Sequence, residues 1–250
     1  MFRNIEKEKL ERMMDQDPEL RKIIQQMLEN HRLALSTVSH ELRNPLTLVY
    51  SSMQLIESQH PEVLTFAHWT QMMEDVNFIV DLTKEIGSLG NSDHMNMTIF
   101  SLKQLLEYAV LSFAMSLEES GIELTGKIDP AIQNYLGDKV KIQEVILNLL
   151  MNAQQAVIRK YQESASTAAK KGTILLQASR THGGVSIQIQ DDGCGIKAED
   201  MASIFEPFYT NKEEGTGLGL SISKKIVEAH HGTLTCSSTY GKGTTFVLTL

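Results

Sequence analysis

Several features are scarce in this chain of 250 residues. Cys194 and Cys236 are its only cysteines, too few for a disulfide framework and not spaced as metal ligands. No run of 18 apolar residues occurs, and residues 1–16 lack the apolar core of a signal peptide. The net charge of −8 provides no basic surface for nucleic acid or for anionic lipid. We therefore expect a cytoplasmic chain with no membrane span and no nucleic-acid partner.

The rest of the composition is typical of a globular protein. Hydrophobic residues make up 42% and charged residues 22%, and the length suits one or two compact domains. The residue pattern changes near position 90. We divide the chain into a charged segment at 1–18, a helical domain at 19–90 and a mixed domain at 91–250.

The helical domain begins with one long apolar stripe. Its members recur at steps of three, four or seven residues, which is typical of a helix that packs along one face. Pro45 interrupts the stripe and removes a backbone hydrogen bond to the carbonyl of Glu41, so we expect a bend just past His40. The stripe consists of Ile24, Leu28, Leu35, Val38, Leu42, Leu46, Val49, Met53 and Ile56.

A second helix is predicted from Pro61 to about Ile86, after a turn at 58–61. Two long helices joined by a short loop form a hairpin, and a second copy would bury its exposed stripe. This pattern predicts a dimeric four-helix bundle. A plain coiled-coil spacer fits the same pattern, and the pattern alone does not decide between the two.

The second domain mixes helices and strands, which indicates an α+β fold built as an α/β sandwich. A polar linker is expected at 87–96, and a mobile polar insertion at 160–172. Ser101 and Asp138 are placed to cap helices. The predicted elements are helices at 102–118, 139–159, 197–203 and 218–230, and strands at 122–124, 173–180, 185–190, 234–238 and 244–250.

Two segments of this domain carry polar residues suited to a nucleotide. Asn148 and Asn152 lie on one helix face, and an amide oxygen together with triphosphate oxygens suits Mg²⁺. Asp191 follows an apolar strand, and Gly193 and Gly195 allow a backbone to approach a ligand closely. Taken alone, each segment also fits a structural role, as solvent-facing asparagines or as a tight turn.

A third segment, residues 215–220, reads Gly-Thr-Gly-Leu-Gly-Leu and leads directly into a helix. Exposed amides at a helix start form a phosphate site, and Lys212 supplies a nearby cation. Phe205 and Phe208 bracket the start of a short lid at 209–214. We expect these two aromatic residues to pack rather than to take part in chemistry.

His40 lies on the first helix, two residues from both Val38 and Leu42. This spacing places it roughly 200° around the helix from each, so it points away from the bundle core. An exposed neutral imidazole can act as a nucleophile, and the adjacent Glu41 can accept its ring proton. Without the nucleotide motifs, His40 would read as an ordinary surface histidine.

In their order and spacing, these segments resemble the boxes of two-component sensor histidine kinases. Residues 40–45, His-Glu-Leu-Arg-Asn-Pro, resemble the H box, and residues 148–153, Asn-Leu-Leu-Met-Asn-Ala, resemble the N box. The resemblance covers roughly residues 20–250. The G1, F, G2 and G3 boxes are matched by residues 191–195, 205–208, 215–220 and 241–244.

The resemblance implies a dimerisation and histidine-phosphotransfer domain at 19–90. It implies a catalytic ATP-binding domain at 91–250, of the type shared by gyrase B, chaperone ATPases, histidine kinases and MutL. The implied cofactors are ATP and Mg²⁺, with Asn152 as the metal ligand and Asp191 as the acceptor for the adenine amino group. The implied nucleotide-site residues are Asn148, Asn152, Asp191, Gly193, Gly195, Phe205, Lys212, Gly215, Thr216, Gly217, Leu218, Gly219, Leu220 and Thr244.

Two positions depart from related patterns. Many members carry a lysine shortly after the second asparagine, whereas Gln155 stands here, which leaves one phosphate contact open. The ATP-hydrolysing relatives carry a glutamate four residues before the magnesium asparagine, whereas Asn148 is no base. The site is therefore expected to pass phosphate to His40 rather than to water. The short lid resembles that of nitrogen-regulatory and sporulation kinases.

The resulting prediction is an ATP-dependent protein-histidine kinase that autophosphorylates His40. Because no receiver-like domain fits in the remaining sequence, we expect transfer to an aspartate of a separate response regulator. Asn44 lies on the face of His40 and by resemblance can orient a water that dephosphorylates that partner. The alternative is an ATP-inactive phosphotransfer or scaffold dimer. A serine kinase is opposed by the absence of a Gly-rich loop, strand lysine and His-Arg-Asp set.

Overall fold

The computed structural model describes residues 13–14, 17–91, 95–118, 120–163, 172–212 and 215–250. The chain forms two compact units that divide after Asn91. Most of the charged segment at 1–18 lies outside the described residues. Within the described part of the chain, no helix combines the length and the apolar character needed to cross a bilayer.

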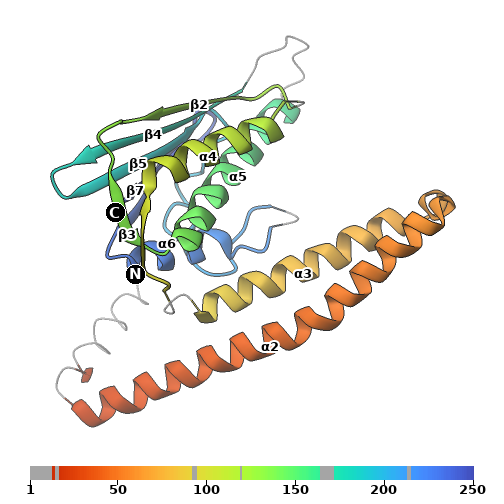
Figure 1. The fold of residues 1–250 in the computed structure, drawn as a ribbon, viewed down its shortest axis with the longest axis horizontal. Helices are drawn as coiled ribbons and strands as arrows, with labels where there is room; N and C mark the ends of the chain where they lie inside the picture. The colour runs from red at the N-terminus through yellow and green to blue at the C-terminus, as the bar shows by residue number, and fades with distance from the viewer. Residues whose placement is uncertain (1–12, 15–16, 92–94, 119, 164–171, 213–214) are drawn as a thin grey trace. The chain divides into compact units, whose positions relative to one another are not determined.

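The first unit opens with α2, Pro18–Gln59, a single helix of 42 residues. Asp17 caps it, because its carboxylate accepts the N–H groups of Glu19 and Leu20 at 2.9 and 3.1 Å. The helix continues unbroken through Pro45 (Figure 1). The helical stripe was therefore predicted correctly as one continuous element.

The helix predicted from Pro61 is wrong at both ends. Pro61 starts the short 3₁₀ helix η1, Pro61–Thr65, and α3 spans Trp69–Asn91. The indole of Trp69 donates to the Glu57 carboxylate at 3.1 Å and ties the start of α3 to the end of α2. Residues 87–91, predicted as linker, are the last residues of α3, and Gly87 is buried against α2. A β-carbon there would lie 3.2 Å from the guanidinium of Arg43.

The second unit is built on a five-stranded sheet in the order β2-β4-β5-β7-β6. β2 and β4 run parallel, and the other neighbours run antiparallel. In the register of β5 and β7, Asp191 lies opposite Thr244. The strands are β2 Glu123–Ile128, β4 Thr173–Thr181, β5 Gly184–Asp191, β6 Thr233–Thr239 and β7 Gly243–Thr249.

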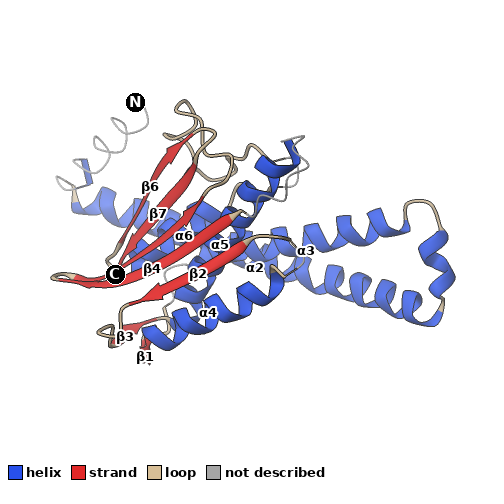
Figure 2. Ribbon diagram, turned by 90° about the horizontal axis from the view of Figure 1, so that it is seen from above, coloured by secondary structure: helices blue, strands red, loops and turns tan. Residues whose placement is uncertain are grey.

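Three helices cover one face of this sheet, as Figure 2 shows: α4 Leu102–Ser116, α5 Lys139–Glu163 and α6 Gly219–Ala229. Alternate side chains of the strands face these helices, so the core lies between two layers and the predicted α/β sandwich is confirmed. The fully buried side chains of this core include Leu106, Ile146, Leu149, Leu150, Leu176, Ile187, Ile189 and Leu218.

Both predicted caps of this unit are confirmed. The Ser101 hydroxyl accepts the N–H of Gln104 at the start of α4. The Asp138 carboxylate accepts the N–H groups of Val140 and Lys141 at 3.1 Å at the start of α5. These caps satisfy donors that the first turn of a helix leaves without intrahelical partners.

Other local predictions for this unit were wrong. Residues 198–203 form turns in place of the helix predicted at 197–203, and residues 160–163 of the predicted insertion continue α5. The rest of that insertion, 164–171, lies outside the described residues. Two short strands were missed, β1 Thr98–Ser101 and β3 Asn134–Gly137, which pair antiparallel. Four residues are too few for an alternating pattern to identify a strand.

Candidate active site

Asn148 and Asn152 belong to a directional chain of hydrogen bonds. The Lys212 ammonium donates to Asn152 Oδ1 at 2.6 Å, and Asn152 Nδ2 donates to Asn148 Oδ1 at 3.3 Å. Asn148 Nδ2 then donates to the hydroxyl of Ser223 on α6 at 2.7 Å. Because an ammonium can only donate, this chain determines which way each amide faces. The amide oxygen of Asn152 therefore faces a cation.

Gly219 provides the close approach that this chain requires. A β-carbon at position 219 would lie 2.5 Å from Asn148 Oδ1, well inside contact distance. The absence of a side chain there lets α6 begin directly beside the asparagine face of α5. The first turn of α6 and the two asparagines therefore share one location.

The start of α6 has the character of an anion site. Its N-cap residue is Leu218, and no side chain caps the helix. Helix N-terminal amides that lack a side-chain partner, together with the helix dipole, favour a phosphate. Leu218 itself is fully buried and anchors the start of α6 in the core. Gly217 adopts a φ of +70°, which turns the chain into the helix.

Asp191 ends β5 with its side chain only 6% exposed. Its Oδ1 accepts the backbone N–H groups of Gly193 at 2.8 Å and Thr244 at 3.3 Å. Burial raises the pKa of the carboxyl to about 6, although these two hydrogen bonds oppose the rise. Among the described residues, no hydrogen bond goes to Oδ2. That oxygen is suited to accept from an amino group.

Asp192, the other acid of this motif, has a different environment. Its Oδ1 accepts the N–H of Thr173 at 2.9 Å, and the Tyr161 hydroxyl donates to its Oδ2 at 3.4 Å. Lys160 donates to its backbone carbonyl. Asp192 thus joins the end of α5 to the start of β4, which is a structural role.

The glycines of this motif are required by the protein's own backbone. A β-carbon at Gly193 would lie 2.6 Å from the backbone of Ala156. Gly195 has a φ of +68°, and a β-carbon there would lie 2.3 Å from the carbonyl oxygen of Thr239. The sequence argument attributed these glycines to the approach of a ligand. In the structure, α5 and the end of β6 make that approach.

The two phenylalanines before the lid behave differently. Phe205 packs edge-on against Phe246 with ring centroids 6.4 Å apart, and the Lys224 ammonium lies 5.2 Å above the Phe205 ring. Phe208 is 67% exposed and has a φ of +65°. The expectation that Phe208 packs is therefore wrong. The last two residues of the predicted lid, 213–214, lie outside the described residues.

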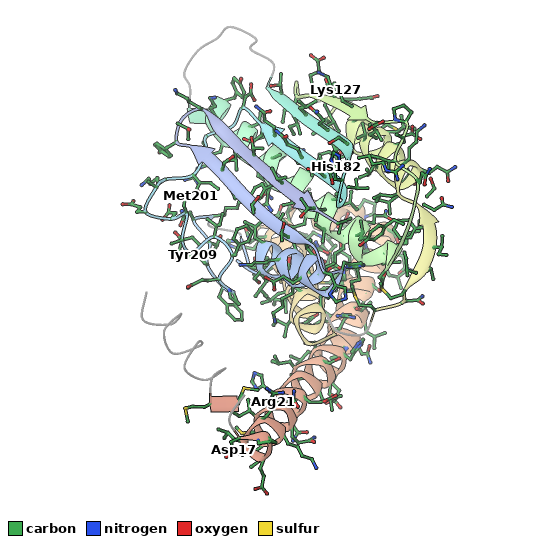
Figure 3. All side chains as sticks on the ribbon, turned by 90° about the vertical axis from the view of Figure 1, so that its left-hand side faces the viewer. Asp17, Arg21, Lys127, His182, Met201 and Tyr209 are labelled. Carbon is green, nitrogen blue, oxygen red and sulfur yellow. The ribbon has the colours of Figure 1, made fainter. Side chains whose placement is uncertain are left out.

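Sequence reasoning missed the residue that holds the segment after Phe208. The hydroxyl of Tyr209 donates to Asp200 Oδ1 at 2.5 Å, and Asn211 Nδ2 donates to Asp200 Oδ2 at 2.7 Å. Figure 3 labels Tyr209 on this loop, together with Met201, which follows Asp200. Sequence reasoning also missed Ser223, whose hydroxyl accepts from Asn148. The only local sign of such a role is a serine among the apolar residues of an amphipathic helix.

His40 lies on α2 with its side chain exposed, and Glu41 and Asn44 are exposed beside it. Its neighbours Ser39 and Arg43 instead face α3. Ser39 is buried, and Arg43 Nη2 donates to the carbonyl of Thr83 at 3.3 Å. The predicted exposure of His40 is confirmed on the single chain, and its direction relative to a bundle core stays a prediction.

The apolar stripe of α2 divides into two sets. Leu35, Leu46 and Met53 are at least partly buried within the single hairpin. The other set remains exposed on the single chain, so the stripe is wider than one partner helix covers. This exposed set comprises Val38, Leu42, Val49 and Ile56.

The chain is similar in sequence to known proteins. Residues 137–250 match the model of the histidine kinase-, DNA gyrase B- and HSP90-like ATPases. AtoS of Escherichia coli, a signal transduction histidine-protein kinase, is 28% identical over 90% of this chain and 36% of its own length. The sensor histidine kinase ZraS of the same organism is 30% identical over 85% of this chain and 44% of its own length.

A solved structure extends the likeness to the fold. Full-length ShkA, crystallised in complex with AMPPNP, matches with a TM-score of 0.69 at 24% identity. The match covers 86% of this chain and 44% of that one. The chain thus spans less than half the length of AtoS, ZraS and ShkA.

Proposed function

Because residues 137–250 belong to the histidine kinase-, DNA gyrase B- and HSP90-like ATPase family and the curated relatives are histidine kinases, we propose that this chain is an ATP-dependent protein-histidine kinase. The observation that carries the proposal is the presence of four features in the second unit. They are the buried acceptor Asp191, the uncapped start of α6, the oriented Asn152 and the cation of Lys212.

In this proposal Asp191 selects adenine. Its Oδ2 accepts a hydrogen bond from the adenine amino group, whereas guanine carries an oxygen at that place. Thr244 supports the contact by donating its N–H to Oδ1 of the same carboxylate. The phosphates extend toward the amides of residues 215–220 and toward Lys212.

The residues present also fit Mg²⁺. Asn152 Oδ1 already faces a cation, since the Lys212 ammonium lies 2.6 Å away, and Mg²⁺ favours oxygen ligands of this kind. Among the described residues, no three His, Cys, Asp or Glu side chains gather into another metal site. We propose Asn152 as the protein ligand and Asn148 as a phosphate contact. The ion, when bound, neutralises charge on the transferring phosphate.

Asn148 favours transfer to a side chain over hydrolysis. Its Oδ1 accepts from Asn152 and its Nδ2 donates to Ser223, so both ends of a neutral amide are engaged. A neutral amide cannot take a proton from water. Position 148 therefore provides no base that would activate water to hydrolyse ATP.

We propose His40 as the acceptor in this reaction. A ring nitrogen of His40 forms a bond to the γ-phosphorus while the bond between that phosphorus and the bridging oxygen of ADP breaks. The proton on the other ring nitrogen passes to Glu41, and ADP leaves with the bonding electron pair. The exposure of His40 and Glu41 supports these roles.

The hairpin supplies the proposed dimer. Val38, Leu42, Val49 and Ile56 follow one another at steps of four and seven and remain exposed on the single chain. A second copy of the hairpin would bury them in a four-helix bundle. We further propose that the phosphoryl group passes to an aspartate of a separate response regulator, and that Asn44 orients water for its later removal.

The central test is incubation of the purified chain with γ-labelled ATP and Mg²⁺. We expect label on the protein that is lost in acid and stable in alkali, and none on His40→Gln. Gln54→Asn, an exposed change on the same helix, is the control and should label normally. Acid-stable label, or label on His40→Gln, would overturn the proposal. No nucleotide binding at all would favour an ATP-inactive scaffold.

A further inference from the structure

The Lys212 ammonium is held by two amide oxygens on α5. It lies 2.6 Å from Asn152 Oδ1 and 2.5 Å from Gln155 Oε1. Both acceptors are neutral, so no carboxylate cancels the charge of the ammonium at these two contacts, although burial lowers the pKa of Lys212. A cation held in this way remains able to attract a phosphate.

The backbone beside Lys212 is anchored from two sides. Arg159 of α5 donates to the carbonyl of Asn211 at 3.3 Å, and the Asn211 side chain donates to Asp200. Asn152, Gln155 and Arg159 follow at steps of three and four and therefore share one face of α5. This face of α5 therefore contacts both residue 211 and residue 212.

Gln155 stands where a lysine would place its charge on α5 itself. We propose that Gln155 is a positioning residue that holds the Lys212 ammonium beside Asn152, so that the missing charge is delivered from residue 212. This inference rests on the proposed ATP site, because the charge it places acts on the nucleotide's phosphates. Gln155 itself need not touch the nucleotide.

Gln155, the second acceptor of the Lys212 ammonium, is needed because Asn152 alone cannot bind both Mg²⁺ and Lys212. The proposed Mg²⁺ site and the Lys212 ammonium both use the single amide oxygen of Asn152. When that oxygen turns to the metal, Gln155 still holds Lys212 within reach of the phosphates. Loss of Gln155 should therefore weaken ATP binding even though Lys212 is present.

The test is calorimetric titration of the full chain with ATP and with ADP in the presence of Mg²⁺. Lys212→Gln should bind ATP about tenfold more weakly, the value expected for one lost charge-assisted hydrogen bond. Gln155→Leu should weaken ATP binding about threefold or more, since Lys212 is no longer held. The charge-swap double variant, Gln155→Lys with Lys212→Gln, should return to within about threefold of wild type.

Gln177→Lys is the matched control, because it makes the same change at an exposed position of β4 and should leave ATP binding unchanged. Two outcomes would overturn the inference: unchanged ATP binding by Gln155→Leu, or a double variant as weak as Lys212→Gln. A purely structural role of Gln155 predicts the latter. If the wild-type chain binds no ATP, both the proposed function and this inference fail. If the wild-type chain binds ATP and only the expected effects of the variants are missing, this inference alone fails.

Discussion

The imidazole of His230 accepts, at Nε2, a hydrogen bond of 2.9 Å from the backbone N–H of Asp138. Its Nδ1 lies 2.8 Å from the carbonyl of Ile226, so the ring is neutral with its proton on Nδ1. His230 follows the end of α6 and is buried against Tyr135. One side chain thus joins the end of α6 to the cap of α5, the two helices on which the proposed phosphate site is built.

His230→Leu should destabilise the second unit. The substitution leaves the N–H of Asp138 buried without an acceptor, which costs about 1–3 kcal/mol in the free energy of unfolding. Urea denaturation followed by circular dichroism measures the change. His182→Leu, in the exposed turn between β4 and β5 (Figure 3), should shift stability by about 0.5 kcal/mol at most. Equal effects of the two substitutions would contradict this role.

Asp191→Asn should change how stability depends on pH. In the folded state the pKa of this carboxyl is raised from 3.8 to about 6, so the folded chain binds the proton more tightly than the unfolded chain does. The resulting stabilisation of the folded state is fully present below pH 3.8. That stabilisation is lost as the pH rises through about 6. Relative to wild type, Asp191→Asn should therefore gain about 2 kcal/mol between pH 4 and 6 and level off above about pH 7.

Unfolding measured at several pH values tests this difference. A flat difference between Asp191→Asn and wild type from pH 4 to pH 7 would refute the assignment. The same variant should also lose its preference for ATP over GTP.

Gly219→Ala should reduce ATP binding while leaving the chain folded. The new methyl would lie 2.5 Å from Asn148 Oδ1 and would push the asparagine away from the start of α6. We expect at least about tenfold weaker binding, equivalent to about 1.4 kcal/mol. Gly183→Ala is the control, because its β-carbon would meet no atom within 4 Å. Normal affinity in Gly219→Ala would show that Asn148 can move without consequence.

The double variant Leu42→Lys with Val49→Lys should dissociate the proposed dimer. Each copy would bring two charges into an apolar interface, where burial of unpaired ammonium groups is costly. Light scattering after gel filtration should give a dimer mass for wild type and a monomer mass for the variant. Gln54→Lys adds charge at an exposed position away from the stripe and should remain dimeric. A monomeric wild type would exclude the bundle.

Much of this protein was determined by its sequence alone, because the decisive interactions there are between near neighbours. Ser101 and Asp138 act as caps on residues two or three positions away. The stripe from Ile24 to Ile56 specifies one helix face at a fixed period, and the outward direction of His40 follows from that period. The strands expected at 173–180 and 185–190 correspond to β4 and β5.

Tertiary structure decided what distant residues do to one another. The sequence places Gln155 and Lys212 more than fifty residues apart, and only the fold brings the ammonium to that amide. The exposure of Phe208 and the division of the apolar stripe also depended on what each surface meets in space. Period and capping act along the chain, whereas hydrogen bonds between elements need the elements to be packed first. The sequence pattern thus singled out His40 and Lys212, but it could not show that the amide oxygen of Gln155 holds the Lys212 ammonium.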